Sequence, residues 1–361
     1  MNQKGLSQLP EVLEQLYRSY GYAAYTMSKF EEYGLYLRNK DFLISDRVLT
    51  FTDTDGKLMA LKPDVTLSII KNTRSREEGI QKLFYRENVY RPGRSMDGFR
   101  EIMQIGLECM GQVDDYCVSE VLTLAVKSLR AISDSCVLDV SHMGLISGLL
   151  DRLGMEGTVR AQALEAIGSK NRPALSQLCR EQQLPETELL QLSELCGVPS
   201  RVLPRLKELF LESRELSQLE QVLQALAEQG CDDCVRLDFS VVNDRKYYNG
   251  IVFRGFVEGV PEGVLSGGEY DGLMARMHRQ EKAIGFALYP DLLERLEEPV
   301  KQPVPDVVLL YPADAGAAAV TAAACQLRSE GRTVCVLPDT GKDCPGGAVY
   351  VLEGNEVKRR G

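Results

Sequence analysis

The segment at 99–111, FREIMQIGLECMG, carries an amide and a carboxylate at a spacing that suits a binding surface. Side chains of a strand alternate between its two faces, so one face here is apolar. The other face presents Gln104, Gly106 and Glu108 in line. A solvated outer face of a sheet would explain the same alternation. A glycine in the middle of a strand favours the alternative, a face that a ligand or another backbone approaches closely.

Two further segments place polar residues before an expected helix. In LKPDVT, at 61–66, Asp64 follows a proline, which is typical of a helix N-cap as well as of a ligand group. In SGGEYDGL, at 266–273, paired glycines precede a helix, and we expect a turn whose backbone approaches a ligand closely. The glycine spacing matches neither the dinucleotide-binding nor the phosphate-loop pattern, so this segment alone predicts no nucleotide site.

Composition excludes several classes of protein. The chain has 361 residues, of which 44% are hydrophobic, and a net charge of −10, so it can bury a core and is not wholly disordered. No apolar run approaches the roughly 18 residues of a membrane span, and the first residues lack the pattern of a signal peptide. Excess acidic charge disfavours nonspecific binding to nucleic acid. We expect a cytoplasmic protein with no membrane partner.

The cysteines and histidines do not predict a metal site. Ten cysteines are scattered along the chain, and Cys231 and Cys234 form its one CxxC pair. A zinc site needs a second pair or histidines, and His142 and His278 are the two histidines of the chain. Histidine-based catalysis is disfavoured for the same reason, and we expect no cofactor.

Hydrophobic periodicity predicts an α+β architecture. Helices are expected at 6–19, 64–73 and 118–132, and strands at 48–53, 57–62, 82–90, 99–110, 136–140, 235–242, 247–257 and 282–287. The stretch at 144–230 has helical spacing and little strand character, which indicates a helical insertion. A proline-rich linker at 297–305 precedes a small βαβ unit.

Taken in order, these segments resemble the catalytic core of histidyl-tRNA synthetases. The motifs that carry the resemblance are TFTD at 50–53, LKPDVT at 61–66, FYRE at 84–87, FRE at 99–101 with Glu108, YYNGIVF at 247–253, GGEYDGL at 267–273 and AIGFA at 283–287. The resemblance implies a class II aminoacyl-tRNA synthetase-like antiparallel sheet with flanking helices. It also implies a core over 1–298 that contains the helical insertion at 144–230. Residues 306–361 would form a shortened α/β unit similar to the anticodon-binding domain.

The departures from the synthetase pattern concern activation of histidine by ATP. Asn243 stands where the family has an arginine that stabilises negative charge, and Leu292 stands where an arginine grips the terminal phosphates. Glu269 replaces a third family arginine. A polyphosphate site that loses guanidinium groups and gains a carboxylate should bind ATP poorly. We therefore expect synthetase activity to be lost and tRNA not to be a partner.

The residues for histidine itself match better. The resemblance assigns the histidine pocket to seven residues: Asp64, Thr66, Gln104, Glu108, Tyr247, Tyr248 and Tyr270. The first three would hold the amino group, Glu108 would meet an imidazole nitrogen, and the tyrosines would wall the side chain. Arg86 and Arg100 match phosphate-binding arginines of the family, although the loop between them is longer here.

A chain that keeps amino-acid ligands but loses activation residues resembles the regulatory subunit of ATP phosphoribosyltransferase. That synthetase paralogue partners a short catalytic subunit in the first step of histidine biosynthesis. The resemblance implies a non-catalytic subunit required for activity and for feedback by free histidine, and a homodimer within a hetero-oligomer. Two alternatives stay open. They are a divergent histidyl-tRNA synthetase and a synthetase-like amino-acid sensor with another partner.

Overall fold

The computed structural model describes residues 8–43, 47–74, 79–93, 98–210, 213–242, 248–296, 305–340, 347–354 and 356–360. The chain divides into two compact units, Met1–Glu297 and Glu298–Gly361, and each is described by itself. Among the described residues, no helix combines the length and the apolar character needed to cross a membrane.

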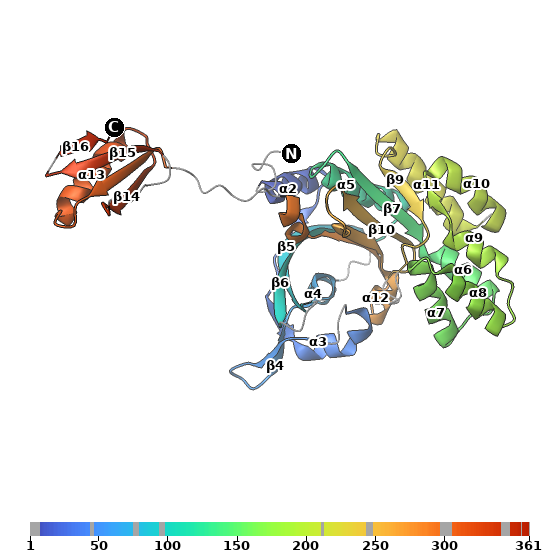
Figure 1. Cartoon of the computed structure of the whole chain (residues 1–361). Coiled ribbons are helices and arrows are strands. Elements are labelled where there is room, and N and C mark those ends of the chain that lie inside the picture. The colour runs from blue at the N-terminus through green and yellow to red at the C-terminus, as the bar shows by residue number, and fades with distance from the viewer. Residues whose placement is uncertain are drawn as a thin grey trace. The chain divides into compact units, whose positions relative to one another are not determined.

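A large, mostly antiparallel sheet organises the first unit (Figure 1). Its nine described strands are, in spatial order, β1 (Ala23–Ala24), β5 (Ile80–Pro92), β6 (Phe99–Gly111), β12 (Lys282–Leu288), β11 (Leu265–Glu269), β10 (Ile251–Val257), β7 (Cys136–His142), β9 (Val235–Asp238) and β8 (Cys196–Gly197). The parallel pairs are β1 with β5 and β7 with β9. A three-stranded sheet lies beside it, in the order β2 (Phe30–Glu32), β4 (Leu58–Leu61) and β3 (Thr50–Thr52).

Helices cover both faces of the large sheet, and each face has its own hydrophobic core. One face carries α2 (Leu9–Ser19) and α5 (Asp115–Arg130). The other carries α3 (Tyr33–Arg38), α4 (Val65–Asn72) and α12 (Asp271–Arg276). In α2, the buried residues Leu9, Leu13 and Tyr17 recur every four positions, which places them on one face of the helix. The sheet therefore separates two layers of helices.

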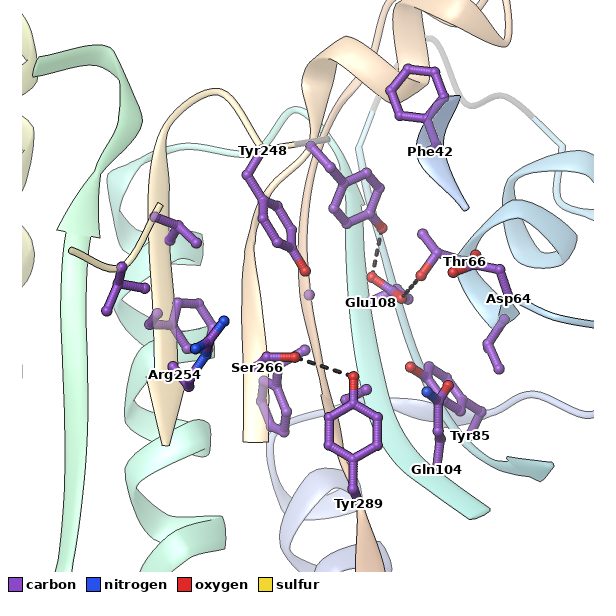
Figure 2. A pocket seen from close by; sticks show the side chains of 18 of the residues that line it. Phe42, Asp64, Thr66, Tyr85, Gln104, Glu108, Tyr248, Arg254, Ser266 and Tyr289 are labelled. Carbon is purple, nitrogen blue, oxygen red and sulfur yellow. Dashed lines mark hydrogen bonds between the residues drawn. The ribbon is translucent and has the colours of Figure 1, made fainter. Parts of the chain in front are cut away.

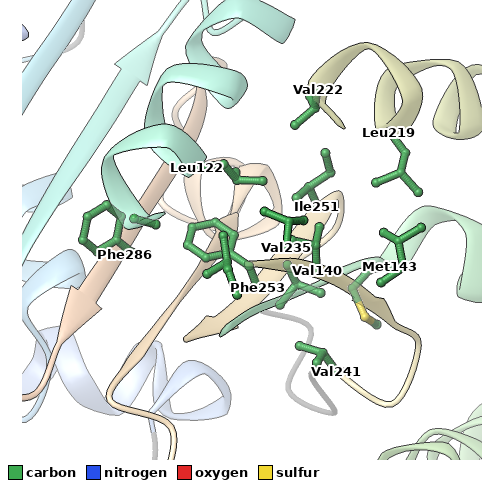
Figure 3. Close-up of a cluster of buried hydrophobic side chains, with 14 of the residues drawn as sticks. Leu122, Val140, Met143, Leu219, Val222, Val235, Val241, Ile251, Phe253 and Phe286 are labelled. Carbon is green, nitrogen blue, oxygen red and sulfur yellow. The ribbon is translucent and has the colours of Figure 1, made fainter. Parts of the chain in front are cut away.

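The helical character expected at 144–230 is present, and these helices share the core of the sheet. They are α6 (Met143–Arg152), α7 (Gly157–Gly168), α8 (Arg172–Glu181), α9 (Thr187–Ser193), α10 (Pro199–Phe210) and α11 (Arg214–Glu228). Figure 3 shows Leu219 and Val222 of α11 with Ile251 of β10 and Leu122 of α5 in one buried cluster. The two-residue strand β8 interrupts the helices, which helical spacing alone did not predict.

The segment of paired glycines differs from expectation. Gly267 and Gly268 lie inside strand β11 and not in a turn. The segment pairs with β10 on one side and β12 on the other, and neighbouring backbone and aromatic side chains leave no room for a side chain at either glycine. A Cβ at Gly267 would lie 2.7 Å from the Phe253 ring, and one at Gly268 would lie 2.9 Å from the Tyr248 ring. The other expected strands and helices are present, although β9 ends at Asp238 and β10 begins at Ile251, inside their expected ranges.

The second unit is a small α/β layer. Its described strands are, in spatial order, β14 (Val334–Pro338), β13 (Val307–Tyr311), β15 (Ala348–Glu353) and β16 (Glu356–Arg359). The first three are parallel, and β16 is antiparallel to β15. Helix α13 (Ala317–Ser329) packs on the sheet through Ala323, Ala324 and Leu327. The expected βαβ arrangement is confirmed, with β15 and β16 added to it.

Candidate functional site

A cavity lies over the middle of the large sheet, on the face that carries α4 and α12. Two rows of directly opposed residues cross the sheet there: Glu108, Gly285, Gly268 and Val252 in one, and Gly106, Ala287, Ser266 and Arg254 in the next. Residues two positions apart share a face, so both rows face the cavity. The central residues of both rows are small. The cavity of about 320 Å³ above them is at the lower end of the range for small-molecule sites.

The Glu108 carboxylate lies in this cavity between two hydroxyl groups, as Figure 2 shows. Thr66 Oγ1 donates to Glu108 Oε1 at 2.8 Å, and the Tyr270 hydroxyl donates to Oε2 at 2.6 Å. Thr66 is in the first turn of α4, and Tyr270 is the residue before α12. Only 2% of the Glu108 surface is exposed. The two hydroxyls leave lone pairs on the carboxylate for a ligand.

Glycines make room for these side chains. A Cβ at Gly285 would lie 1.8 Å from Glu108 Oε2, and a Cβ at Gly106 would lie 2.5 Å from the Tyr85 hydroxyl oxygen. The polar face of the segment at 99–111 is therefore a buried cavity wall and not a solvated face. The mid-strand glycine permits close approach, and the groups that approach Gly106 are the Phe286 carbonyl on β12 and the Tyr85 side chain on β5.

The cavity makes its carboxyl groups difficult to ionise. Burial raises the pKa of Glu108 to about 8, the hydrogen bonds from Tyr270 and Thr66 oppose the rise, and the charge of Asp64 adds to it. Burial also raises the pKa of Asp64, against a lowering by the Arg91 guanidinium. A ligand that brings positive charge or N–H donors stabilises the ionised carboxylates. The electrostatics therefore favour a ligand with amine or imidazole groups.

Asp64 is both a helix cap and a cavity residue. Its Oδ1 accepts the backbone N–H of Leu67 at 2.9 Å and so caps α4. Its Oδ2 lies 4.0 Å from Arg91 Nη2. Arg91 Nε also donates to the Pro63 carbonyl at 2.8 Å, which fixes the segment that carries Asp64. The two roles that the sequence left open are therefore compatible.

The structure brings most of the expected histidine-pocket residues together. The cavity is lined by Asp64, Thr66, Gln104, Glu108, Tyr248 and Tyr270. Gln104 is 3% exposed and lies on the same face of β6 as Glu108. Burial raises the pKa of the Tyr248 hydroxyl well above its usual range, so Tyr248 is neutral. Tyr247 lies outside the described residues.

The expected phosphate-binding arginines are not at the cavity, and a different arginine is. Along β5, Tyr85 and Arg91 face the cavity, whereas Phe84 lies in the core with α2 and α5 on the other face of the sheet. Arg86 is therefore on the opposite face, where its Nη1 lies 3.4 Å from Glu11 on α2. Arg100 is exposed near the outer end of β6 and is not among the cavity-lining residues. Counting in steps of two from Tyr85 along the predicted strand would have found Arg91.

Glu269 does not face the cavity either. Its Oε2 accepts the backbone N–H of Ile251 at 2.6 Å, and its Oε1 lies 3.4 Å from Gln218 Nε2 on α11. Glu269 and Tyr270 are consecutive, and Tyr270 is the one that reaches into the cavity. The expectation that Glu269 adds a carboxylate to a phosphate site is wrong, because the side chain points to the opposite face of the sheet.

Two departures from the synthetase pattern remain, Leu292 and Asn243. Leu292 lies in the 3-10 helix η2 (Pro290–Leu296) and packs against the core on the α5 face. It therefore contributes no charge to the cavity. Asn243 lies outside the described residues.

Comparison with known proteins identifies the family. The family model described as histidyl-tRNA synthetase matches residues 2–293. A Thermus thermophilus protein named ATP phosphoribosyltransferase regulatory subunit is 30% identical over 308 residues, which are 82% of this chain and 81% of the relative. The chain belongs to the histidyl-tRNA synthetase family and, within it, to the ATP phosphoribosyltransferase regulatory subunits. A regulatory subunit from Desulforamulus reducens is 28% identical over 321 residues, 84% of this chain and 79% of the relative.

Solved structures confirm the class II synthetase-like α+β fold. A Bacillus halodurans protein described as an ATP phosphoribosyltransferase regulatory subunit/histidyl-tRNA synthetase superposes with a TM-score of 0.77 at 20% identity, over 97% of this chain and 95% of its own. The histidyl-tRNA synthetase from Nostoc superposes with a TM-score of 0.70 at 17% identity, over 94% of this chain and 83% of its own. At these identities the comparison concerns the fold alone.

Proposed function

We propose that this chain is a non-catalytic regulatory subunit which a short-form ATP phosphoribosyltransferase requires for activity, and through which histidine inhibits that enzyme. The relatives that carry the name of regulatory subunit support the role. One observation carries the choice of effector. The buried Glu108 carboxylate is held by Thr66 and Tyr270 inside a cavity and keeps hydrogen-bonding capacity for a ligand.

In this proposal, free histidine binds with its imidazole against Glu108. Its amino group lies near Asp64, Thr66 and Gln104. A carboxylate and an imidazole N–H form a charge-assisted hydrogen bond, and an imidazolium would stabilise the ionised form of a carboxyl whose pKa burial has raised. Three tyrosines complete the proposed pocket: Tyr247, Tyr248 and Tyr270.

The chain has lost synthetase activity in this proposal, and it binds neither tRNA nor a cofactor. Activation of an amino acid by ATP needs preorganised positive charge around the phosphates. Leu292 contributes none, because its side chain is apolar and packs against the core. Arg86 and Arg100 lie outside the cavity. These placements support a site that holds an amino acid without activating it.

The proposed partner is the catalytic subunit of ATP phosphoribosyltransferase, in a hetero-oligomer that contains a homodimer of this chain. A solved ATP phosphoribosyl transferase complex from Thermotoga maritima contains a chain of this fold, with a TM-score of 0.63 and 19% identity, over 78% of this chain and 96% of its own. That complex supports an assembly of this kind. We also propose that residues 1–298 are the synthetase-like core and residues 306–361 a shortened anticodon-binding-like unit.

The test combines the purified chain with the short transferase from the same genome and measures formation of phosphoribosyl-ATP. We expect the transferase to need this chain for full activity and to respond to histidine only in its presence. A coupling of about 1–3 kcal/mol between the histidine site and the partner's site would change binding affinity roughly 5- to 150-fold. The Glu108→Gln variant should shift histidine inhibition to higher concentration. A transferase that is equally active alone, or equally inhibited without this chain, would overturn the proposal.

A further inference from the structure

The cavity holds two carboxyl groups at one end, where Arg91 lies beside Asp64, and a second guanidinium at the other end. Asp64 and Glu108 lie at the end formed by α4 and β6, and Arg254 lies at the other end, on β10 (Figure 2). The positions between them on the sheet are occupied by small residues: Gly106, Ala287 and Ser266. Strands β6 and β10 are three strand spacings apart, roughly 14 Å between their backbones. Side chains that project from both ends of this span leave room between them for a small zwitterion.

The Arg254 guanidinium is available for a ligand. Its stem packs on Gly263, where a Cβ would lie 2.7 Å from Cγ and Cδ of Arg254. Asp139 lies directly opposite Arg254 on β7, yet in the part of the chain that the structure describes Arg254 has no ion pair with Asp139 or any other carboxylate. Arg254 is exposed and still lines the cavity, which places it at the cavity mouth.

We propose that Arg254 binds the carboxylate of the amino-acid effector and makes the site selective for free amino acids over the corresponding amines. This inference rests on the proposed function, which gives partners to the imidazole and the amino group of histidine but none to its carboxylate. A guanidinium pairs with a carboxylate through two parallel hydrogen bonds, a geometry that lysine does not reproduce. The ligand then lies across the sheet, with its cationic groups at Asp64 and Glu108 and its anionic group at Arg254.

Calorimetry with two ligands tests this assignment. Histidine and histamine have the same side chain and amino group and differ only in the carboxylate. We expect Arg254→Gln to weaken histidine binding by about ten-fold and to change histamine binding by less than about two-fold. Arg254→Lys should retain part of the affinity for histidine. The matched control is Arg236→Gln. Arg236 is an exposed arginine on β9, directly opposite Asp139, and it does not line the cavity. It should change neither affinity.

The outcomes separate the inference from the function on which it rests. Equal histidine binding by Arg254→Gln and wild type would overturn the role of Arg254 and leave the proposed function standing. Equal weakening of histidine and histamine would also overturn it, since the effect would not involve the carboxylate. Absence of histidine binding to the wild-type chain would overturn both.

Discussion

Gly285 and Glu108 lie directly opposite each other on β12 and β6, and the Glu108 carboxylate occupies the space where a side chain at Gly285 would be. The distance from Oε2 to a Cβ built at Gly285 is 1.8 Å, far below any real contact. The position of the carboxylate in the cavity therefore depends on the absence of an atom on the neighbouring strand.

Gly285→Ala should displace the Glu108 carboxylate from Thr66 and Tyr270 and weaken histidine binding by roughly ten-fold or more. Calorimetry measures the affinity. The matched control is Gly148→Ala, because Gly148 lies within α6 and a Cβ there would meet nothing within 4 Å. The control should bind histidine as the wild type does and be slightly more stable, by about 0.5–1 kcal/mol. Equal affinities of the two variants would contradict this account.

Glu108→Ala should weaken histidine binding by roughly ten-fold or more, since a hydrogen bond to a charged group contributes about 1.5–3 kcal/mol. Glu101→Ala provides the comparison on the same strand. Glu101 is exposed, contacts Asn88 and Tyr90, and does not line the cavity. If both variants bind histidine with wild-type affinity, the effector binds elsewhere.

The common face of Gln104, Gly106 and Glu108 on β6 could be predicted, because the alternation of side chains along a strand depends only on that strand's own sequence. Strand β11 could not be predicted in the same way. Paired glycines are unfavourable in a strand by their own conformational freedom and favour turns. What makes Gly267 and Gly268 part of a strand is pairing with β10 and β12, and the close approach of Phe253 and Tyr248 leaves room only for glycine there.

Arg91, the arginine that lines the cavity beside Asp64, could not be predicted from a local motif either. Matching the FYRE motif to the family pointed to Arg86, but a motif does not specify which face of the sheet a residue occupies. The opposition of Tyr85 to Gly106 and of Arg91 to Arg100 determines the faces, and this register involves two segments. The expected role of Glu269 failed for the same reason.

Arg91→Gln should weaken histidine binding several-fold, and Arg86→Gln should leave it unchanged. Arg91 lowers the pKa of Asp64 and donates to the Pro63 carbonyl. Its loss should therefore favour the protonated, neutral form of Asp64 and release the segment that positions it. Arg86 faces α2 in an exposed ion pair, whose contribution is small. Titrations of both variants with histidine check the contrast, and the reverse order would show that Arg86, and not Arg91, supports the histidine site.

The raised pKa of Glu108 predicts a pH dependence of stability. The folded state holds this proton up to about pH 8, whereas the unfolded chain releases it near the ordinary value of 4.5. Between these values the folded state binds more protons, so the free energy of unfolding falls as pH rises. Glu108→Gln lacks this titration and should gain stability relative to wild type across that window.

Chemical denaturation at several pH values between about 5 and 8 measures this difference. The difference in the free energy of unfolding between Glu108→Gln and wild type should widen with increasing pH. It should become constant above the pKa of Glu108, about 8. Parallel stability profiles would show that Glu108 titrates alike in the folded and unfolded states.

The purified chain should not catalyse histidine-dependent exchange of pyrophosphate into ATP. Leu292 is apolar and packs against the core, and a missing preorganised charge typically costs two or three orders of magnitude in rate, about 10²–10³. A histidyl-tRNA synthetase assayed in parallel serves as the positive control. Robust exchange by this chain would support the divergent synthetase in place of the regulatory subunit.

The unbroken pairing of β5 with β6, from Ile80 opposite Gly111 to Pro92 opposite Phe99, restricts which changes in length the chain can accept. Removal of one residue between Tyr85 and Arg91 would turn every later side chain of the strand to the other face and carry Arg91 away from Asp64. The hairpin at 53–56 joins strands that contribute no described residue to the cavity lining. Insertions and deletions should therefore be tolerated at that hairpin and excluded from β5, even where substitutions in β5 are harmless.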